Sequence, residues 1–399
     1  MADTRHSSRG PLTRTAFRVP FLIPGGLALL AGLDAALALL GLPHVLVGAR
    51  LADVHGPLMV LGFVGTVISL ERSVALGRAW GYLAPALNGL GALAVVSVLP
   101  FEVGAGLLVA AQLFALLVYR SLYARQPMAA VAVQILGSLM ALGAAVLWLA
   151  GVPVPGLLPW LVGYLVLTIF GERLELARIG ALSPRDAVAA QLVAVTFVVA
   201  AMTALLAPEA GFVLLGLALL GAAGWLVAKD VARRTIHATG LPRYIAGCLL
   251  AGYGWLAVAG AFWLLGGQVD GRAYDAATHA VFLGFVISMI MAHAPVILPA
   301  VLRRPLPYHP LFIVPAVLLH ATLLLRLAVG DARDLGWAVQ AGGVGNIVAV
   351  LLFVVLAGWS VLRPQRTGRT QPRPVRPATQ PTPATQPAPA TTTTSQGAS

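Results

Sequence analysis

The sequence predicts an all-α fold, a polytopic bundle of twelve transmembrane helices. Of the 399 residues, 59% are hydrophobic and only 10% carry a charged side chain, and the mean hydropathy is +0.89. The apolar residues also fall into separate runs of about 20 residues, which is the length that crosses a bilayer as a helix. We therefore expect a chain that lies mostly in a lipid bilayer rather than a soluble domain.

Three regions follow one another along the chain. Residues 1–16 are polar and rich in arginine, and they predict a cytoplasmic N-terminal segment. Residues 17–362 form the predicted membrane domain. From Arg363 the composition changes to Pro, Thr, Gln and Ala, so 363–399 is expected to be a disordered cytoplasmic tail without the apolar side chains of a core. The expected spans are 17–42, 51–73, 79–100, 103–124, 127–150, 156–178, 185–207, 210–232, 243–267, 274–301, 308–329 and 335–362.

Cations predict the orientation of these spans. The connections after even-numbered spans are rich in arginine and lysine, and the opposite connections hold few cations. By the positive-inside rule, both termini are expected in the cytoplasm, which fits an even number of spans. The expected location is the cell inner or plasma membrane.

Charge and cysteine content exclude several classes of function. The formal charge is +12, but the arginines sit at the ends of apolar runs and in the tail. Topology explains them, and nucleic acid is not an expected partner. Cys248 is the single cysteine, so intrachain disulfides, cysteine-rich zinc sites and iron–sulfur ligation are excluded.

An internal repeat is visible in spans 2, 6 and 10. The segments GFVGTVISLERSVAL, GYLVLTIFGERLELA and GFVISMIMAHAPVIL begin at Gly62, Gly163 and Gly284 and align without gaps. Glu71, Glu172 and His293 share one column of this alignment. Because the segments are four spans apart, the repeat predicts three four-helix units around a pseudo-threefold axis. The alternative is a chance similarity between membrane helices.

Two histidines occupy corresponding places in spans 2 and 10. His55 and His279 each lie near the predicted outer start of their span, with the small residues Gly56 and Ala280 beside them. An ionisable side chain in a membrane span suggests a functional site. Two imidazoles from facing helices at one depth are suitable axial ligands for a haem. The alternative is that each histidine hydrogen-bonds a neighbouring carbonyl.

A second group of histidines is predicted nearer the cytoplasmic side. His293 lies on span 10, fourteen residues or about 21 Å along the helix from His279, so one small cofactor cannot bridge the two. His309 and His320 share a face of span 11. Together with Met289 and Met291 nearby, these three histidines form a candidate copper site. The alternatives are that His309 lies in a surface loop and that His320 is a satisfied lone histidine.

Two Glu-Arg pairs end spans 2 and 6. Glu71-Arg72 and Glu172-Arg173 are expected to be interfacial ion pairs that fix the helix ends. A proton path is the alternative.

The histidine segments resemble a known family. HGPLMVLGFVG from His55 and HAVFLGFVISMIMAHAP from His279 are similar to the histidine-bearing segments of the NnrS family. That resemblance implies twelve spans, a fold like subunit I of the haem–copper oxidases, haem and copper, and a link to nitric oxide and nitrosative stress. The chain departs from the family after span 2, where it continues SLERSVALGRAWGY. Spans 6 and 7 also hold no histidine, so an oxidase copper site and oxygen reduction are not expected.

The function expected from the sequence is haem binding in the membrane, linked to nitric oxide or redox stress. A b-type haem at His55 and His279 is the expected cofactor, with copper at His293, His309 and His320 as a second. Beside the lipid bilayer and haem, nitric oxide or an electron donor is an expected partner. Two alternatives stay open: a proton-coupled secondary transporter, with the histidines as proton or substrate groups, and a haem-free subunit of a membrane complex. The sequence does not decide whether the protein turns over a substrate.

Overall fold

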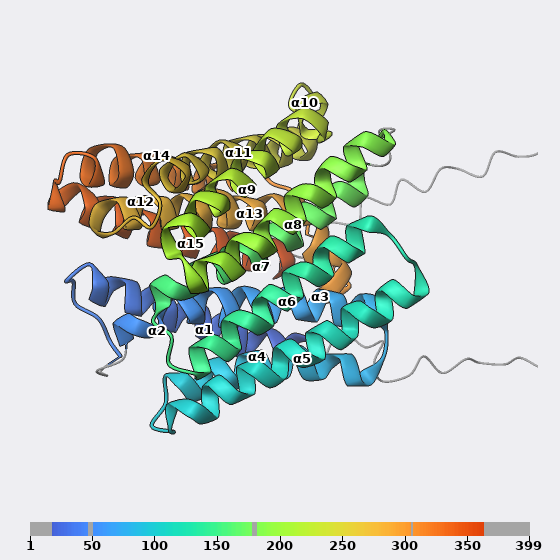
Figure 1. Ribbon diagram of the computed structural model, residues 1–399, viewed down its shortest axis with the longest axis horizontal. Helices are drawn as coiled ribbons and strands as arrows, with labels where there is room; N and C mark the ends of the chain where they lie inside the picture. Colours follow the sequence, from blue (N-terminus) through green and yellow to red (C-terminus); the bar gives the residue numbers. More distant parts are fainter. Residues whose placement is uncertain (1–17, 47–50, 178–181, 305, 363–399) are drawn as a thin grey trace, which may run out of the picture. The chain divides into compact units, whose positions relative to one another are not determined.

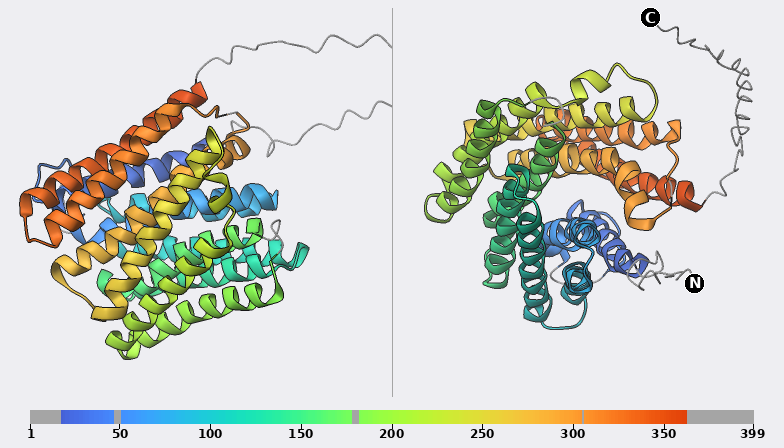
Figure 2. Two further views of the ribbon diagram at one scale, coloured as in Figure 1. Left: turned by 90° about the horizontal axis from the view of Figure 1, so that it is seen from above. Right: turned by 90° about the vertical axis from the view of Figure 1, so that its right-hand side faces the viewer.

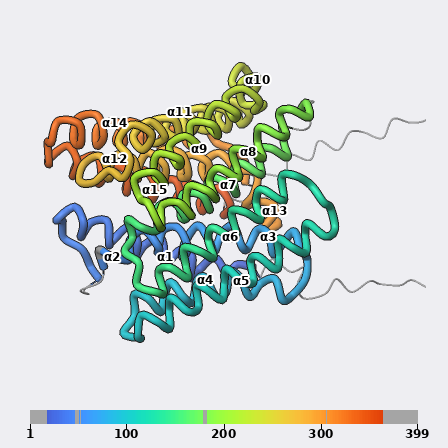
Figure 3. Tube along the Cα trace, viewed as in Figure 1, coloured from blue at the N-terminus to red at the C-terminus, as the bar shows by residue number. Residues whose placement is uncertain are grey.

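All regular secondary structure in the described part of the protein is helical. The computed structural model describes residues 18–46, 51–177, 182–304 and 306–362, so the predicted segments 1–16 and 363–399 lie outside it. Figures 1 and 3 show the chain passing back and forth as long helices. In chain order they are α1 (Val19–Leu39), α2 (Leu51–Pro57), η3 (Leu58–Val64), α3 (Gly65–Leu76), η4 (Ala79–Tyr82), α4 (Leu83–Val95), α5 (Phe101–Arg125), α6 (Ala129–Leu149), α7 (Val154–Ala177), α8 (Pro184–Leu206), α9 (Pro208–Lys229), α10 (Ala232–Thr235), α11 (Leu241–Gly266), α12 (Gly271–His279), η6 (Ala280–Ile287), α13 (Ser288–Leu302), η7 (Pro310–Phe312), α14 (Ile313–Leu324), η8 (Leu325–Asp331) and α15 (Gly336–Leu362).

The prediction of a multi-pass helical membrane protein is confirmed. Among the described residues, eleven helical segments are long and apolar enough to cross a bilayer. The predicted third span, 79–100, is shorter than its neighbours, because the 3₁₀ turn η4 precedes a 13-residue α4. Gly77 ends the preceding helix with a φ of 68°, a left-handed conformation that glycine adopts without strain.

Hydrogen bonds near the helix ends show that the start of α1 and the end of α15 lie close to the connection after α13. Arg18, before α1, donates hydrogen bonds to the carbonyls of Ala300 and Val301 at the end of α13. Near the end of α15, Ser360 donates to the carbonyl of Pro307. These contacts join the first and last described helices to the connection between α13 and η7. The start of α1 and the end of α15 thus lie at the same end of the bundle.

Three segments that were aligned by sequence meet inside the bundle. We call them span 2 (α2, η3 and α3), span 6 (α7) and span 10 (α12, η6 and α13). Contacts join α2 to α7, α7 to η6 and α13 to α3, so each segment touches the other two. Span 6 is also the most enclosed: 78% of its apolar stretch is buried, compared with 28% for α8. Figure 2 shows the helices from two further directions, coloured along the chain.

The aligned glycines allow close helix contacts in spans 2, 6 and 10. A methyl group at Gly62 would lie 2.8 Å from Cβ of Ala92 in α4 and 3.2 Å from Cβ of Ala28 in α1. At Gly163 it would meet Met140 of α6, and at Gly284 it would meet Trp255 of α11. In each case one partner lies on the helix that precedes the glycine's own span, although the nearest partner of Gly62 is on α4. Packing therefore supports the repeat that the sequence alignment suggested.

Spans 2 and 10 share a departure from regular α-helix. The π-helices η3 and η6 begin at Leu58 and Ala280, each four residues before the aligned glycine. In span 6 the corresponding position is Pro159, which lies inside a continuous α-helix. Short π-helical segments are frequent at functional sites because they change the direction in which side chains point. Here they directly follow the segments that carry His55 and His279.

Candidate cofactor-binding site

A large cavity lies beside His55 and His279. Its volume is about 1080 Å³, and its lining comes from α1, span 2, the start of α5, the end of α6, span 6, span 10, η8 and α15. Most of the wall is apolar, with Met59, Leu158 and Phe282 among its side chains. A concave, mainly apolar cavity with a few placed polar groups is the usual form of a small-molecule or cofactor site.

His55 is held by a neighbouring helix. Its Nδ1 lies 2.8 Å from the carbonyl oxygen of Gly32 in α1. A carbonyl only accepts hydrogen bonds, so this contact assigns the proton of the neutral ring to Nδ1. The other nitrogen, Nε2, then keeps its lone pair. A ligating histidine has this arrangement, with its second nitrogen bonded to a carbonyl or carboxylate.

His279 is held in the same way by its own helix. Its Nδ1 lies 2.9 Å from the carbonyl oxygen of Asp275 and 3.1 Å from the carboxylate of the same residue. Arg326 in η8 donates two hydrogen bonds to that carboxylate, at 2.8 and 2.7 Å. The imidazole is thus oriented through an aspartate that an arginine fixes in place, and its Nε2 also keeps a lone pair.

These residues fit a haem that is ligated by two imidazoles. Both histidines line one cavity, and both assigned lone pairs are on Nε2. The histidine contacts to carbonyls that were the simpler alternative are present as well, but they occupy only Nδ1. The arginines around the cavity are already paired: Arg326 with Asp275, and Arg272 with Asp334 at 3.0 Å. Carboxylate groups of a ligand would therefore compete with aspartates for these two guanidinium groups.

Sequence reasoning missed the groups that hold the two histidines. Asp275 lies four residues before His279, and this spacing places both on one face of a helix, so the pair was detectable. Arg326 lies 51 residues from Asp275, and the Gly32 carbonyl belongs to another helix. Neither contact leaves a signal in the local sequence.

The three histidines of the predicted copper site each have different partners. His320 accepts a hydrogen bond at Nδ1 from the indole of Trp255, at 3.0 Å, and its Nε2 lies 3.3 Å from the Ser288 hydroxyl. His309 accepts from the backbone N–H of Leu311. Within the described ranges, no group of three or more His, Cys, Asp and Glu side chains is arranged to hold a metal ion. The geometry gives the copper prediction at His293, His309 and His320 no support.

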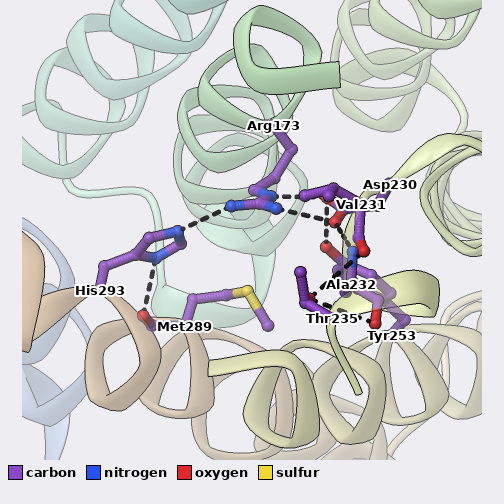
Figure 4. A network of polar contacts seen from close by, with 8 residues as sticks. All are labelled: Arg173, Asp230, Val231, Ala232, Thr235, Tyr253, Met289 and His293. Atoms are coloured by element: carbon purple, nitrogen blue, oxygen red, sulfur yellow. Dashed lines mark hydrogen bonds and ion pairs between the residues drawn. The ribbon is translucent and has the colours of Figure 1, made fainter. Parts of the chain in front are cut away.

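His293 belongs instead to a buried polar network, shown in Figure 4. Arg173 of span 6 lies between Asp230 and His293. It donates to the Asp230 carboxylate at 2.6 and 2.7 Å, and its NH1 lies 3.4 Å from Nε2 of His293. Tyr253 also donates to Asp230, at 2.9 Å. Nδ1 of His293 contacts the carbonyl of Met289 at 2.8 Å.

The Glu-Arg pairs form cross-helix contacts rather than only local ones. Arg72 of span 2 pairs with Glu172 of span 6 and, at 3.2 Å, with its neighbour Glu71. The simple expectation of separate interfacial pairs at two helix ends is therefore incomplete. The ion pairs join the central spans to one another.

The fold and the cavity define the class: a polytopic helical membrane protein with a cofactor-sized cavity beside two oriented histidines. A family profile described as Domain of unknown function (DUF8744) matches residues 18–362, so the chain belongs to this family. No curated protein and no solved structure matches the chain.

Proposed function

We propose that this protein binds a haem in the membrane through His55 and His279, and that it acts in the response to nitric oxide or redox stress. One observation carries the proposal. Two imidazoles line one large cavity, and each has its Nδ1 bonded to a carbonyl and its Nε2 left as a potential ligand. The proposal includes twelve spans with an architecture like subunit I of the haem–copper oxidases, and cytoplasmic termini.

Each residue of the site has a role in this proposal. His55 and His279 would hold the haem iron through their Nε2 atoms. Asp275 and Arg326 keep the His279 ring in one orientation, and the Gly32 carbonyl does the same for His55. The apolar side chains of the cavity wall, such as Leu158 and Phe282, would surround the haem. When bound, the haem supplies one-electron redox chemistry.

The architecture has support of its own. Spans 2, 6 and 10 contact one another pairwise, and the aligned glycine of each span lies close to the helix that precedes that span, with Gly62 also close to α4. The shorter segment 79–95 joins the end of span 2 to α5. Arg125, at the end of α5, donates to the carbonyl of Leu76, while Phe101, at the start of α5, makes an edge-to-face contact with Trp148 near the end of α6. The chain between Leu76 and Phe101 thus runs along the bundle, which favours a twelfth crossing.

Absorption spectroscopy of the purified protein tests the haem proposal. We expect a Soret band, and the sharp bands of a six-coordinate low-spin haem after reduction. A colourless preparation that still fails to take up added haem contradicts the proposal. The link to nitric oxide is tested by the growth of a deletion strain under a nitric oxide donor, with and without the intact gene.

A secondary transporter is the competing function, and one observation favours it. Three carboxylates, those of Asp53, Glu102 and Asp275, line the cavity together with Arg272 and Arg326. Such a set of charged groups could bind a polar or cationic substrate and exchange protons with it during transport. Proton uptake into liposomes that depends on an added solute, with colourless protein, distinguishes a transporter from a haem protein.

A further inference from the structure

A network of polar side chains at the end of span 2 opposite His55 follows the sequence repeat of spans 2, 6 and 10. Glu71, Glu172 and His293 share one alignment column, and an arginine follows each of the first two. Arg72 of span 2 pairs with Glu172 of span 6. Arg173 of span 6 in turn contacts His293 of span 10. Each arginine thus reaches the column residue of the next repeat. Ala294 stands where the third arginine would be, so the series stops there.

In the half of this network that contains Arg173, the positive and negative charges balance. Asp230 receives two hydrogen bonds from Arg173, one from the Tyr253 hydroxyl and one from the backbone N–H of Ala232. Both oxygens of this carboxylate are therefore occupied by hydrogen-bond donors, and Arg173 contacts both of them as a guanidinium–carboxylate ion pair. Asp230 neutralises the charge of Arg173, so neither residue is available to balance another group.

His293 adds no positive charge to the network. Its Nδ1 contacts the Met289 carbonyl and therefore carries the proton, while its Nε2 faces the NH1 donor of Arg173. A guanidinium only donates hydrogen bonds, so Nε2 accepts and remains unprotonated. The ring is neutral in this arrangement.

The other half holds two carboxylates and a single guanidinium. Arg72 pairs with both Glu71 and Glu172, and the charges that act on Glu71 are those of Arg72 and Glu172. The three side chains are only 14 to 25% exposed. Two carboxylates that share one site in a largely dehydrated place cannot both stay ionised easily, and one of them binds a proton instead.

No other described cation compensates for the second carboxylate. Arg18 from α1 donates to carbonyls at the end of α13, and Arg125 from α5 donates to the Leu76 carbonyl. Tyr119, also from α5, contributes its ring, 6.0 Å from the Arg72 guanidinium carbon. His293 from α13 is neutral, as shown above.

We propose that Glu71 is an exchangeable proton-binding site. Of the two carboxylates, Glu172 has the closer contact with Arg72, and Glu71 is the more exposed at 25%. The proton is taken from water, and the neutral carboxyl keeps its contact with Arg72 through a carbonyl oxygen. Glu71 lies sixteen residues from His55 on the same span, about 24 Å along the helix. The site does not depend on the haem proposal.

Infrared spectroscopy of the full-length protein in liposomes tests the proposal. At mildly acidic pH we expect the carbonyl stretching band of a protonated carboxylic acid, shifted by exchange into D₂O and lost as the pH rises. Glu71→Gln should remove the band. Glu175→Gln, an exposed carboxylate on the same end of span 6, is the matched control and should retain it.

Two further variants locate the proton. Glu71→Asp should change the frequency of the band, while Glu172→Asp should leave the frequency unchanged. The proposal is overturned if the wild-type protein shows no such band, or if the band survives in Glu71→Gln. It is also overturned if only Glu172→Asp changes the frequency. A protein that lacks the band and gains thermal stability when sodium is added would contradict it too, because a metal cation would then balance the second carboxylate.

Discussion

Arg326 holds the carboxylate of Asp275 with two hydrogen bonds, at 2.8 and 2.7 Å, across 51 residues of sequence. Through this contact, η8 of span 11 controls the orientation of a histidine on span 10. Asp275 reaches Nδ1 of His279 at 3.1 Å. The pair therefore joins two helices and also fixes the imidazole that faces the cavity.

Asp275→Asn should weaken haem binding by about 10- to 100-fold, the usual cost of removing a residue that orients a metal-binding histidine. Titration of haem into the haem-depleted protein measures the change. Asp270→Asn is the matched control, because Asp270 is exposed and lies just before the same helix. Equal affinities for the two variants would show that Asp275 does not position the ligand.

Replacing either outer histidine should change the spectrum of the bound haem. A bis-histidine haem needs both imidazoles, and loss of either one removes a strong-field ligand of the iron. His55→Ala and His279→Ala should each abolish or convert the low-spin spectrum. His293→Ala should leave it intact, because His293 lies about 21 Å farther along span 10 and contacts Arg173 instead. Loss of haem from the His293 variant alone would place the cofactor at the other end of the bundle.

Much of the fold could be predicted from apolar run lengths, because backbone groups in a bilayer must be satisfied within each helix. The glycines that the repeat aligned, Gly62, Gly163 and Gly284, lie on spans that contact one another, a relationship that the alignment alone did not predict. The shorter helix at 83–95 was not predicted, since Gly77 and the 3₁₀ turn at Ala79–Tyr82 take up part of an apolar run.

The candidate site was less predictable than the fold. His55 and His279 could be predicted to lie near each other because they occupy corresponding positions in aligned spans. The hydrogen bonding of His320 depends on the indole of Trp255, which is 65 residues away in the sequence. That of His293 depends on Arg173, which is 120 residues away. Such partners are set by tertiary packing, so residue types and spacing in one helix do not reveal them.

Reporter fusions test the orientation of the bundle. Fusions at Gln268, between α11 and α12, and at Gln365, after α15, should give opposite signals, because an odd number of crossings separates them in the twelve-span topology. The Gln365 fusion should report the cytoplasm. The same signal from both positions would contradict the topology.

Gly284→Ala should destabilise the protein by about 1–3 kcal/mol, the range for an added methyl group in a packed core. The new methyl would meet the Trp255 ring in α11. Gly254→Ala is the control in the same packed pair of helices, because a methyl there meets nothing within 4 Å. Thermal unfolding in detergent compares the two, and equal midpoints would argue against the close helix approach.

Two neighbouring ion pairs, one buried and one exposed, allow a measurement of how much free energy of unfolding is lost when a buried charge has no partner. Arg173 and Asp230 are 4% and 1% exposed, whereas Lys229 in the adjacent pair with Asp186 is 39% exposed. Asp230→Asn should destabilise the protein by about 3–5 kcal/mol, because it leaves the Arg173 guanidinium buried without its counter-ion. Lys229→Gln should cost less than about 1 kcal/mol, because water screens that pair.

A double substitution separates the two contributions to this cost. Arg173→Met combined with Asp230→Leu removes both charges, so it should be less destabilising than Asp230→Asn alone, even though both replacements delete hydrogen bonds. Thermal unfolding in one detergent compares all three variants with the wild-type protein. If Asp230→Asn costs no more than Lys229→Gln, water must reach Arg173, and the network that joins span 6 to span 10 is more hydrated than its exposed fractions imply.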